Sequence, residues 1–224
     1  MPRPFLKICG LRRLDDLFRA LELGARYAGL IVEAPGSPRS LGLEEAARLA
    51  AYTPGKIVAV VRDLPEARLR EVLDAVQPAA VQLHGQEPPE LVAALRVAFP
   101  EVQVWRALGV PRCAEDRERE VARLGEEAGA YAQAGAGAVL LDTRLPRGSG
   151  GTGVCCDWEV AAELARSLLL PVILAGGLGP GNLAAAARAV APAGLDVSSG
   201  IEEAPGVKSM TALERLFREW GKLG

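Results

Sequence analysis

The stretch FLKICGLRRLDDLFRALELGARYAGLIV, residues 5–32, contains the unit from which the chain is built. Its two ends, 5–10 and 27–32, are short and mostly apolar runs, which is typical of buried parallel strands. The segment LDDLFRALELG between them has apolar residues at helical spacing and closes at Gly24, a residue that often ends helices. The stretch therefore predicts a strand, a helix and a second strand.

The same unit recurs along the chain. Six more apolar runs precede amphipathic stretches, at 56–61, 80–85, 102–109, 138–143, 171–177 and 194–200. Strict alternation of strand and helix predicts a parallel sheet. Eight units without a break in composition predict an α/β fold, a (β/α)8 TIM barrel that forms a single domain over residues 1–224. An open doubly wound sheet is the alternative, because strand counts from a sequence err easily.

Composition narrows the classes of partner. The formal net charge is -2, which argues against binding to nucleic acid or a membrane surface through bulk charge. No apolar run reaches the roughly 18 residues of a membrane span, and the N-terminus shows no signal peptide. We therefore expect a cytoplasmic protein with reduced thiols. The chain has few candidate metal ligands, because its four cysteines lack CxxC spacing and it contains a single histidine. We therefore expect no structural zinc site.

Polar residues stand where several of the strands end. Alternation places Lys7 and Cys9 on one face of the first strand, and His84, Asp142 and Asp196 lie near the ends of other strands. Barrel enzymes carry their catalytic residues at the carboxyl ends of the strands. We therefore predict one polar mouth. Each residue alone has a plainer interpretation, a turn or cap partner for His or Asp and core packing for Cys9.

Two glycine-rich loops follow the last two strands. AGGLGPGN and SSG let backbone N–H groups approach an anion, and barrels commonly bind phosphate at these loops. We assign a phosphate to Gly176, Gly177, Ser199 and Gly200, with tight turns as the alternative. A third loop, GSGGTG at 148–153, matches GxGxxG but does not directly join a strand to a helix. It fits a loop that closes over the mouth better than a dinucleotide site.

Taken together, these motifs make the chain resemble the phosphoribosylanthranilate isomerase family. The segments that carry the resemblance are, in chain order, KICG, SPRS, VQLHG, LLDT with GGTG, DW, ILAGGL and DVSSGIEEAPGVK. The resemblance runs from Lys7 to Lys208, and KICG and the LDT…GGTG pair are its most specific parts. It implies an enzyme of tryptophan biosynthesis that converts N-(5-phosphoribosyl)anthranilate to 1-(2-carboxyphenylamino)-1-deoxyribulose 5-phosphate by an Amadori rearrangement. It implies a small phosphosugar–anthranilate as the substrate, with no cofactor and no metal.

The resemblance also assigns roles to residues. It makes Cys9 the general base and Asp142 the general acid, and it makes Arg39 the group that binds the anthranilate carboxylate, for which a guanidinium fork is suited. It gives His84 and Asp196 supporting roles in substrate binding. Asp142 would need a raised pKa, and Cys9 would need thiolate character.

The chain departs from the family pattern in four places. SPRS lacks the usual aromatic residue after Arg39, and VEAPG before it places Glu33 near the mouth. The charged segment 113–129 is longer than expected and is interpreted as a solvated helix. The pair Cys155–Cys156 is expected to pack in the core, because adjacent cysteines rarely form an unstrained disulfide.

Other functions remain open alternatives. An indole-glycerol-phosphate synthase should carry several catalytic lysines and a pentose-phosphate epimerase several histidine ligands, whereas the chain has four lysines and one histidine. A phosphosugar-binding barrel without catalysis is a third, and the presence of both Cys9 and Asp142 argues against it. The sequence is also compatible with a homodimer, since Phe217 and Trp220 could serve a core or an interface.

Overall fold

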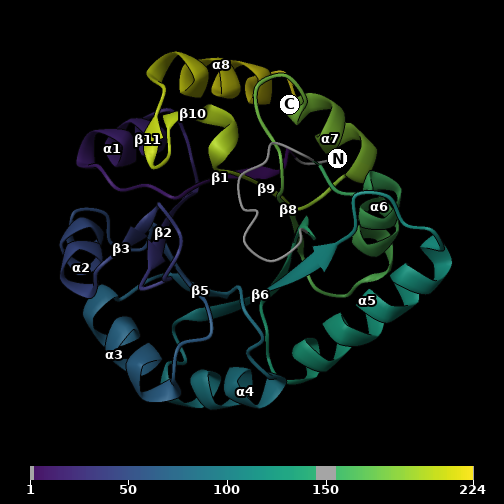
Figure 1. The fold of residues 1–224 in the computed structure, drawn as a ribbon, viewed down its shortest axis with the longest axis horizontal. Helices are drawn as coiled ribbons and strands as arrows, with labels where there is room; N and C mark the ends of the chain where they lie inside the picture. Colours follow the sequence, from purple (N-terminus) through teal and green to yellow (C-terminus); the bar gives the residue numbers. More distant parts are fainter. Residues whose placement is uncertain (1–2, 145–154, 224) are drawn as a thin grey trace.

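The computed structural model describes residues 3–144 and 155–223, and its centre is a closed barrel of parallel strands (Figure 1). In ring order the strands are β1 (Phe5–Cys9), β2 (Tyr27–Val32), β4 (Ile57–Val61), β5 (Ala80–Leu83), β6 (Gln103–Val110), β7 (Ala138–Thr143), β8 (Val172–Leu174) and β9 (Gly194–Val197). Parallel pairing of β1 with both β2 and β9 closes the ring. The predicted (β/α)8 barrel is therefore confirmed, and the open sheet is wrong.

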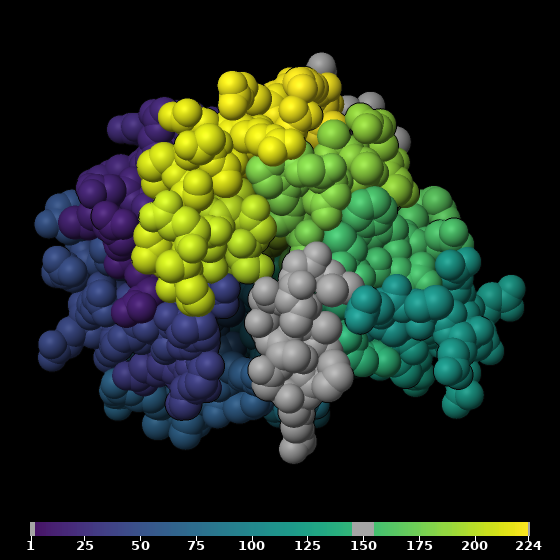
Figure 2. Space-filling view, turned by 45° about the horizontal axis from the view of Figure 1, so that its top comes forward, coloured from purple at the N-terminus to yellow at the C-terminus, as the bar shows by residue number. Residues whose placement is uncertain are grey.

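Helices surround the barrel on all sides (Figure 1). They are α1 (Leu14–Glu22), α2 (Leu43–Ala51), α3 (Glu66–Val76), α4 (Pro89–Ala98), α5 (Arg117–Gln133), α6 (Trp158–Ser167), α7 (Leu183–Val190) and α8 (Met210–Gly221). Figure 2 shows the first segments, in purple, beside the last, in yellow, as the β1–β9 pairing requires. Among the helices that the structure describes, none is both long and apolar enough to cross a membrane.

Short elements that the apolar runs did not indicate lie around the carboxyl end of the barrel. β3 (Ser40–Leu41) adds to the edge of β2. The turn η1 (Ser199–Ile201) follows β9 and leads into a small antiparallel hairpin of β10 (Glu202–Ala204) and β11 (Val207–Lys208). Gly206, with φ of +81°, supplies the left-handed backbone that this tight hairpin needs. Lys208 ends β11 and Arg39 directly precedes β3, and both residues matter for the site.

The strands divide the apolar residues into two layers. Leu6 and Ile8 belong to the outer layer, which packs between the barrel and its helices. Cys9 belongs to the inner layer, and Lys7 crosses the interior to reach Gln82 on β5. The alternation predicted for the first strand is therefore confirmed, with Lys7 and Cys9 facing the barrel axis.

Aromatic rings fill the amino end of the barrel. Phe5 and Tyr27 pack edge to face with their ring centroids 5.5 Å apart, and Tyr27 packs on Trp105 in the same way at 5.2 Å. Gly194 gives the Phe5 ring its space, since a Cβ there would lie 2.5 Å from the ring atom Cε2. Because this end is closed by apolar groups, polar side chains inside the barrel gather at the carboxyl end.

Two segments with open interpretations pack within the chain. The charged segment around 113–129 forms most of α5, which buries Leu124, Ala128 and Tyr131 and leaves its other faces largely exposed, as predicted. Phe217 is buried in the core. Trp220 donates from Nε1 to the Pro4 carbonyl at 2.8 Å, and the Arg3 guanidinium lies 3.7 Å from its ring centroid.

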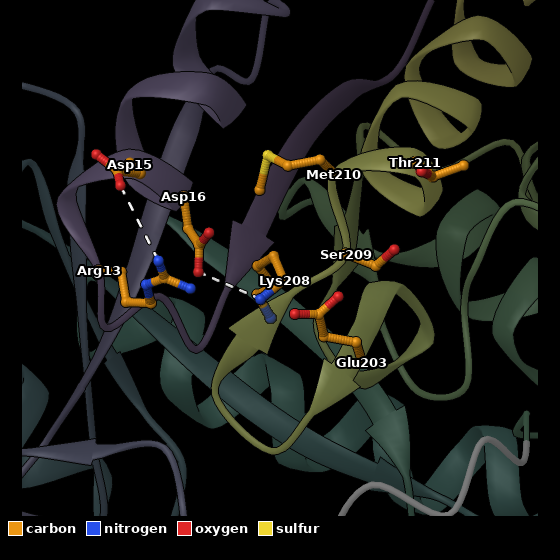
Figure 3. Close-up of a pocket in the computed structure, with 8 residues that line it drawn as sticks. All are labelled: Arg13, Asp15, Asp16, Glu203, Lys208, Ser209, Met210 and Thr211. Atoms are coloured by element: carbon orange, nitrogen blue, oxygen red, sulfur yellow. Dashed lines mark hydrogen bonds and ion pairs between the residues drawn. The ribbon is translucent and has the colours of Figure 1, made fainter.

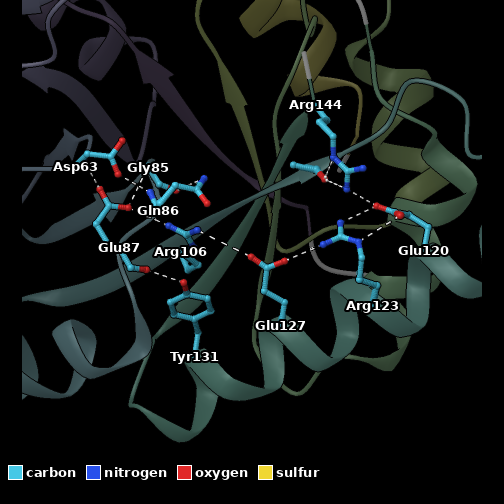
Figure 4. A network of polar contacts seen from close by, with 11 residues as sticks. Asp63, Gly85, Gln86, Glu87, Arg106, Glu120, Arg123, Glu127, Tyr131 and Arg144 are labelled. Carbon is cyan, nitrogen blue, oxygen red and sulfur yellow. Dashed lines mark hydrogen bonds and ion pairs between the residues drawn. The ribbon is translucent and has the colours of Figure 1, made fainter. Parts of the chain in front are cut away.

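A buried ion pair supports the mouth from outside the barrel (Figure 4). The Glu87 carboxylate accepts hydrogen bonds from Arg106 Nη1 at 2.9 Å and from the backbone N–H groups of Asp63 and Gly85, at 2.7 and 2.8 Å. Tyr131 donates from its hydroxyl to the Glu87 carbonyl at 2.6 Å. The carboxylate of Glu87 thus ties the loops after β4 and β5 to β6, and the backbone carbonyl of the same residue links them to α5 through Tyr131.

We predict that Glu87→Ala lowers the free energy of unfolding by about 3–5 kcal/mol. The substitution leaves the Arg106 guanidinium buried without its nearest carboxylate and removes the acceptor of two backbone N–H groups. Urea unfolding followed by circular dichroism measures the change. In the control Glu66→Ala, which removes an exposed pair with Arg70, the loss should stay below about 1 kcal/mol. Equal losses in both variants would contradict the supporting role of Glu87.

Candidate active site

Six polar side chains converge inside the carboxyl end of the barrel. They come from β1, from β5 and its following residue, from β7 and from β9, and they are Lys7, Cys9, Gln82, His84, Asp142 and Asp196. The structure therefore brings together four of the predicted site residues, and it adds Gln82 and Lys7 as their bonding partners. The predicted single polar mouth is present.

Lys7 is the most buried of these groups, with no exposed surface. Its ammonium donates to Asp196 Oδ2 at 2.8 Å and to Gln82 Oε1 at 3.0 Å. Burial alone would lower the pKa of Lys7, but the charges of Asp196 and Cys9 raise it above its ordinary value. Lys7 therefore lies in the floor of the site as a cation paired with Asp196.

Cys9 points into the barrel at the end of β1 and is 6% exposed. The space for its sulfur comes from Gly29 on β2, where a Cβ would lie 2.8 Å from Sγ. Burial raises the pKa of the Cys9 thiol, and the nearby ammonium groups of Lys7 and Lys208 lower it in part. The thiol is therefore a weak acid in the free protein, with two buried cations near enough to stabilise its thiolate.

Lys208 was not predicted to take part in the site. Its ammonium donates to the carbonyls of Cys9 and Ser198, at 2.7 and 3.1 Å, and to Glu202 Oε1 at 2.9 Å. Two of the chain's four lysines are thus buried beside the same cysteine. The sequence signal was their presence in KICG and GVK, but only the folded hairpin brings Lys208 to β1.

Asp142 lies near the carboxyl end of β7, which is separated from β1 by β8 and β9 in the ring. Its Oδ1 accepts from the Thr143 backbone N–H at 2.7 Å, and its Oδ2 lies 3.5 Å from His84 Nε2. Burial raises the pKa of the Asp142 carboxyl, while His84 and the Thr143 N–H lower it in part. About a third of the side chain, 34%, remains accessible from the mouth. The carboxyl is thus placed to hold a proton and still reach a ligand.

Arg39 lies in the predicted region but with a partner that was not foreseen. Its Nε and Nη2 donate to the two carboxylate oxygens of Glu202, at 2.8 and 2.6 Å. Its Cδ occupies the space over Gly10, where a Cβ would lie 2.6 Å from it. Burial alone would raise the pKa of Glu202, but Arg39 and Lys208 hold it below the ordinary value. The carboxylate therefore stays charged and fixes the guanidinium.

The two loops assigned to phosphate touch each other. A Cβ on Gly200 would collide with the Leu178 carbonyl, so the loops after β8 and β9 pack backbone to backbone there. Gly176 and Gly177 have φ of +82° and +63°, the left-handed region that favours glycine. The chain's single asparagine, Asn182, shapes the loop by accepting from the Gly179 N–H at 2.8 Å and donating to the Gly177 carbonyl at 2.9 Å. Phosphate binding here stays a prediction.

The departures from the family pattern have separate outcomes. Glu33 lies on the rim and is neutralised by Arg68, whose Nε donates to it at 2.7 Å. All four cysteines are free, and Cys156 is in the core as predicted. Cys155 is not: it is half-buried and accepts from Asn182 Nδ2 at 3.3 Å. The GSGGTG loop lies outside the described residues.

A cavity of about 320 Å³ lies beside the mouth, between the start of α1, the β10–β11 hairpin and the start of α8 (Figure 3). Its lining residues are Arg13, Asp15, Asp16, Glu203, Lys208, Ser209, Met210 and Thr211. None of the predicted site residues lines it. Lys208 forms part of its wall while its ammonium bonds to the Cys9 carbonyl, so the cavity is separate from the mouth.

We predict that Gly176→Ala disturbs the Asp142 carboxyl. A Cβ at this position would collide with Thr143 Oγ1 and lie 2.8 Å from Asp142 Oδ1, and the left-handed backbone adds strain. The expected loss is about 1–3 kcal/mol in the free energy of unfolding, measured by urea denaturation. Gly181→Ala in the same loop meets no atom within 4 Å and is the control. Equal stability of the two variants would contradict this close packing.

Comparison with known proteins gives consistent matches over nearly the whole chain. The family model described as N-(5'-phosphoribosyl)anthranilate (PRA) isomerase matches residues 6–219. The N-(5'-phosphoribosyl)anthranilate isomerase of Myxococcus xanthus is 40% identical over 223 residues, covering 95% of this chain and 94% of the relative.

Solved structures agree with this match. Monomers generated from the dimeric phosphoribosylanthranilate isomerase of Thermotoga maritima superpose with a TM-score of 0.79 at 30% identity, covering 98% of this chain and 99% of theirs. A phosphoribosylanthranilate isomerase in complex with reduced 1-(o-carboxyphenylamino)-1-deoxyribulose 5-phosphate superposes with a TM-score of 0.77 at 29% identity, covering 98% and 99%.

Proposed function

Because this chain belongs to the N-(5'-phosphoribosyl)anthranilate isomerase family, we propose that Cys9 and Asp142 carry out the two proton transfers of the reaction. The enzyme is an intramolecular oxidoreductase of tryptophan biosynthesis and converts phosphoribosylanthranilate to 1-(2-carboxyphenylamino)-1-deoxyribulose 5-phosphate. The observation that carries the proposal is the placement of a buried thiol on β1 and a carboxyl with a raised pKa on β7 in one mouth.

In the first step Asp142 gives its proton to the ring oxygen of the ribose. The bond between that oxygen and C1' breaks, and the electron pair of the anthranilate nitrogen forms the C1'–N double bond of an iminium. The raised pKa of Asp142 keeps it protonated to a higher pH than an ordinary carboxyl. The carboxylate left behind keeps its hydrogen bond from the Thr143 N–H and faces His84 Nε2.

In the second step the Cys9 thiolate removes the proton from C2', which the iminium has made acidic. The C2'–H electron pair forms the C1'–C2' double bond of an enolamine, and the iminium nitrogen regains its electron pair. Ketonisation of the enolamine gives the product, so the substrate is isomerised without net gain or loss of atoms. Lys7 and Lys208 lower the cost of forming the thiolate in a buried place.

Arg39 can bind the anthranilate carboxylate without losing Glu202. Glu202 occupies the Nε and Nη2 edge of the guanidinium. The Nη1 and Nη2 edge presents two parallel N–H groups in the geometry that suits a carboxylate. Glu202 would then orient Arg39 rather than compete with the substrate. We propose that the phosphate is bound by Gly176, Gly177, Ser199 and Gly200. Between the phosphate and the anthranilate carboxylate, the substrate would be supported by His84 and Asp196.

Further parts of the proposal concern the whole molecule. We propose one barrel domain over residues 1–224, supported by continuous strand pairing from β1 to β9. A cytoplasmic location is proposed from the sequence and from the role in amino-acid biosynthesis. A homodimer is proposed because the Thermotoga maritima relative is described as dimeric.

We predict that Cys9→Ser and Asp142→Asn each lower kcat by about 10²–10⁴-fold. Each variant keeps the size of the side chain and removes one proton transfer. The assay follows the loss of anthranilate fluorescence after mixing enzyme with freshly made phosphoribosylanthranilate. Cys113→Ser, which changes an exposed cysteine, is the matched control and should keep the wild-type rate. A rate near wild type in either site variant would refute the role of that residue.

The pH dependence separates the two groups. Burial raises the pKa of Asp142, and it raises that of Cys9 above the ordinary thiol value, which is itself above neutrality. The wild-type kcat/KM should therefore rise with pH as thiolate forms. It should level off once Asp142 begins to lose its proton, because the loss of acid then offsets the gain of base. In Asp142→Asn the residual rate depends on the thiolate alone. It should therefore keep rising through neutral pH, and parallel profiles for the two proteins would refute the assignment.

A further inference from the structure

We propose that Lys7 and Gln82 fix the tautomer of His84, so that Nε2 carries the ring hydrogen and directs it at Asp142. Lys7 and Gln82 are then positioning residues for the reaction. The inference about the tautomer stands on the hydrogen bonds alone, and its consequence for catalysis rests on the proposed role of Asp142.

The orientation of the Gln82 amide follows from Lys7. The Lys7 ammonium lies 3.0 Å from Gln82 Oε1 and has only hydrogens to offer, so it accepts no bond. The oxygen of the amide must therefore face Lys7, and the amide nitrogen must face the other way. Gln82 is 1% exposed, so water does not supply a competing arrangement.

The tautomer of His84 follows from Gln82. Gln82 Nε2 lies 3.0 Å from His84 Nδ1, and an amide nitrogen can only donate. Nδ1 must therefore be the bare ring nitrogen that accepts. In a neutral imidazole the hydrogen is then on Nε2, which lies 3.5 Å from Asp142 Oδ2.

The start of this chain of bonds is fixed in the floor of the barrel. Lys7 is fully buried and donates also to Asp196 Oδ2 at 2.8 Å. Reversing the amide would place its NH₂ against the ammonium. The amide N–H would then lack this acceptor and Lys7 would keep only Asp196, and an unsatisfied buried donor costs about 1–3 kcal/mol. The direction of donation, from Lys7 through Gln82 to His84, is thus set by a group that cannot be reversed.

The fixed tautomer has a chemical consequence at Asp142. The carboxyl meets His84 Nε2 from the residue after β5, the Thr143 N–H from its own strand, the charges of Lys7 and Asp196, and the thiol of Cys156. Because Nε2 already carries a hydrogen, it cannot take the proton of Asp142. That proton remains available to the substrate, and the carboxylate formed afterwards faces a donor.

The chain offers an unusually direct test, because His84 is its single histidine. Ring ¹⁵N labelling of histidine in a protein freed of any affinity tag gives NMR signals of this residue alone. In the wild type at neutral pH, Nδ1 should give the shift of a bare nitrogen and Nε2 that of a nitrogen bearing hydrogen. The opposite pattern, or averaged shifts of two exchanging tautomers, would overturn the proposal.

Gln82→Glu reverses the last bond with almost no change in shape. A carboxylate accepts from Lys7 and from His84 alike, so Nδ1 must gain a hydrogen, and its ¹⁵N shift should move accordingly. We expect kcat to fall by about tenfold or more with KM within about threefold of wild type. An unchanged Nδ1 shift would overturn the proposal.

Matched variants separate positioning from charge and from folding. Gln86→Glu makes the same chemical change on an exposed side chain four residues away and should leave the His84 shifts and kcat unchanged. Gln82→Leu removes both bonds and should give two tautomers in exchange, even if the protein is less stable. A wild-type pattern of shifts in Gln82→Leu would mean that Gln82 does not set the tautomer.

The two proposals fail in different ways. If Asp142→Asn keeps its activity, the role of Asp142 as the acid fails while the His84 shifts still report the tautomer. If the shifts follow the prediction but Gln82→Glu keeps the wild-type kcat, the bonds fix the tautomer and the reaction does not depend on it, which overturns the catalytic consequence.

Discussion

The buried ammonium of Lys7 is the constraint on which the interior of this barrel depends. A full charge without exposed surface costs several kcal/mol unless it is paired and hydrogen bonded, and here the partners come from β9 and β5. The fold therefore needs Asp196 and Gln82 as acceptors for the Lys7 ammonium, whatever they also do for a substrate. Burial raises the pKa of Cys9, and the same charge offsets part of that rise. Through Gln82, Lys7 is also linked to the histidine beside Asp142. One cation thus organises both sides of the mouth.

Space is the second constraint, and glycine provides it. Three side chains proposed to act on the substrate each lie against a position where a Cβ would collide with or crowd them. Cys9 lies against Gly29, Arg39 against Gly10, and Asp142 against Gly176, and each contact joins neighbouring strands or loops. The positions of these three side chains therefore depend on glycine at the neighbouring residues.

The parts predicted from the sequence are those that depend on local pattern. Apolar runs gave the eight strands, and alternation along β1 placed Lys7 and Cys9 on the inner face. The pairing of Arg39 with Glu202 and the bond from Lys208 to Cys9 were missed, because each joins residues more than 160 positions apart. Gln82 was not among the predicted site residues, because its role depends on which neighbour fixes its amide. The prediction that Cys155 lies in the core is wrong, because its contact with Asn182 is tertiary and leaves no local pattern in the sequence.

The bond from Lys208 to the Cys9 carbonyl also bears on how the enzyme comes into being. Residue 9 leaves the ribosome long before residue 208, and β1 has only one of its two neighbouring strands until β9 has been made. A nascent chain thus carries an open strand edge and an incomplete mouth through most of its synthesis. The ammonium of Lys208 reaches the strand of the proposed base only after the last hairpin has been made, so an unfinished chain lacks one of the two buried cations beside Cys9.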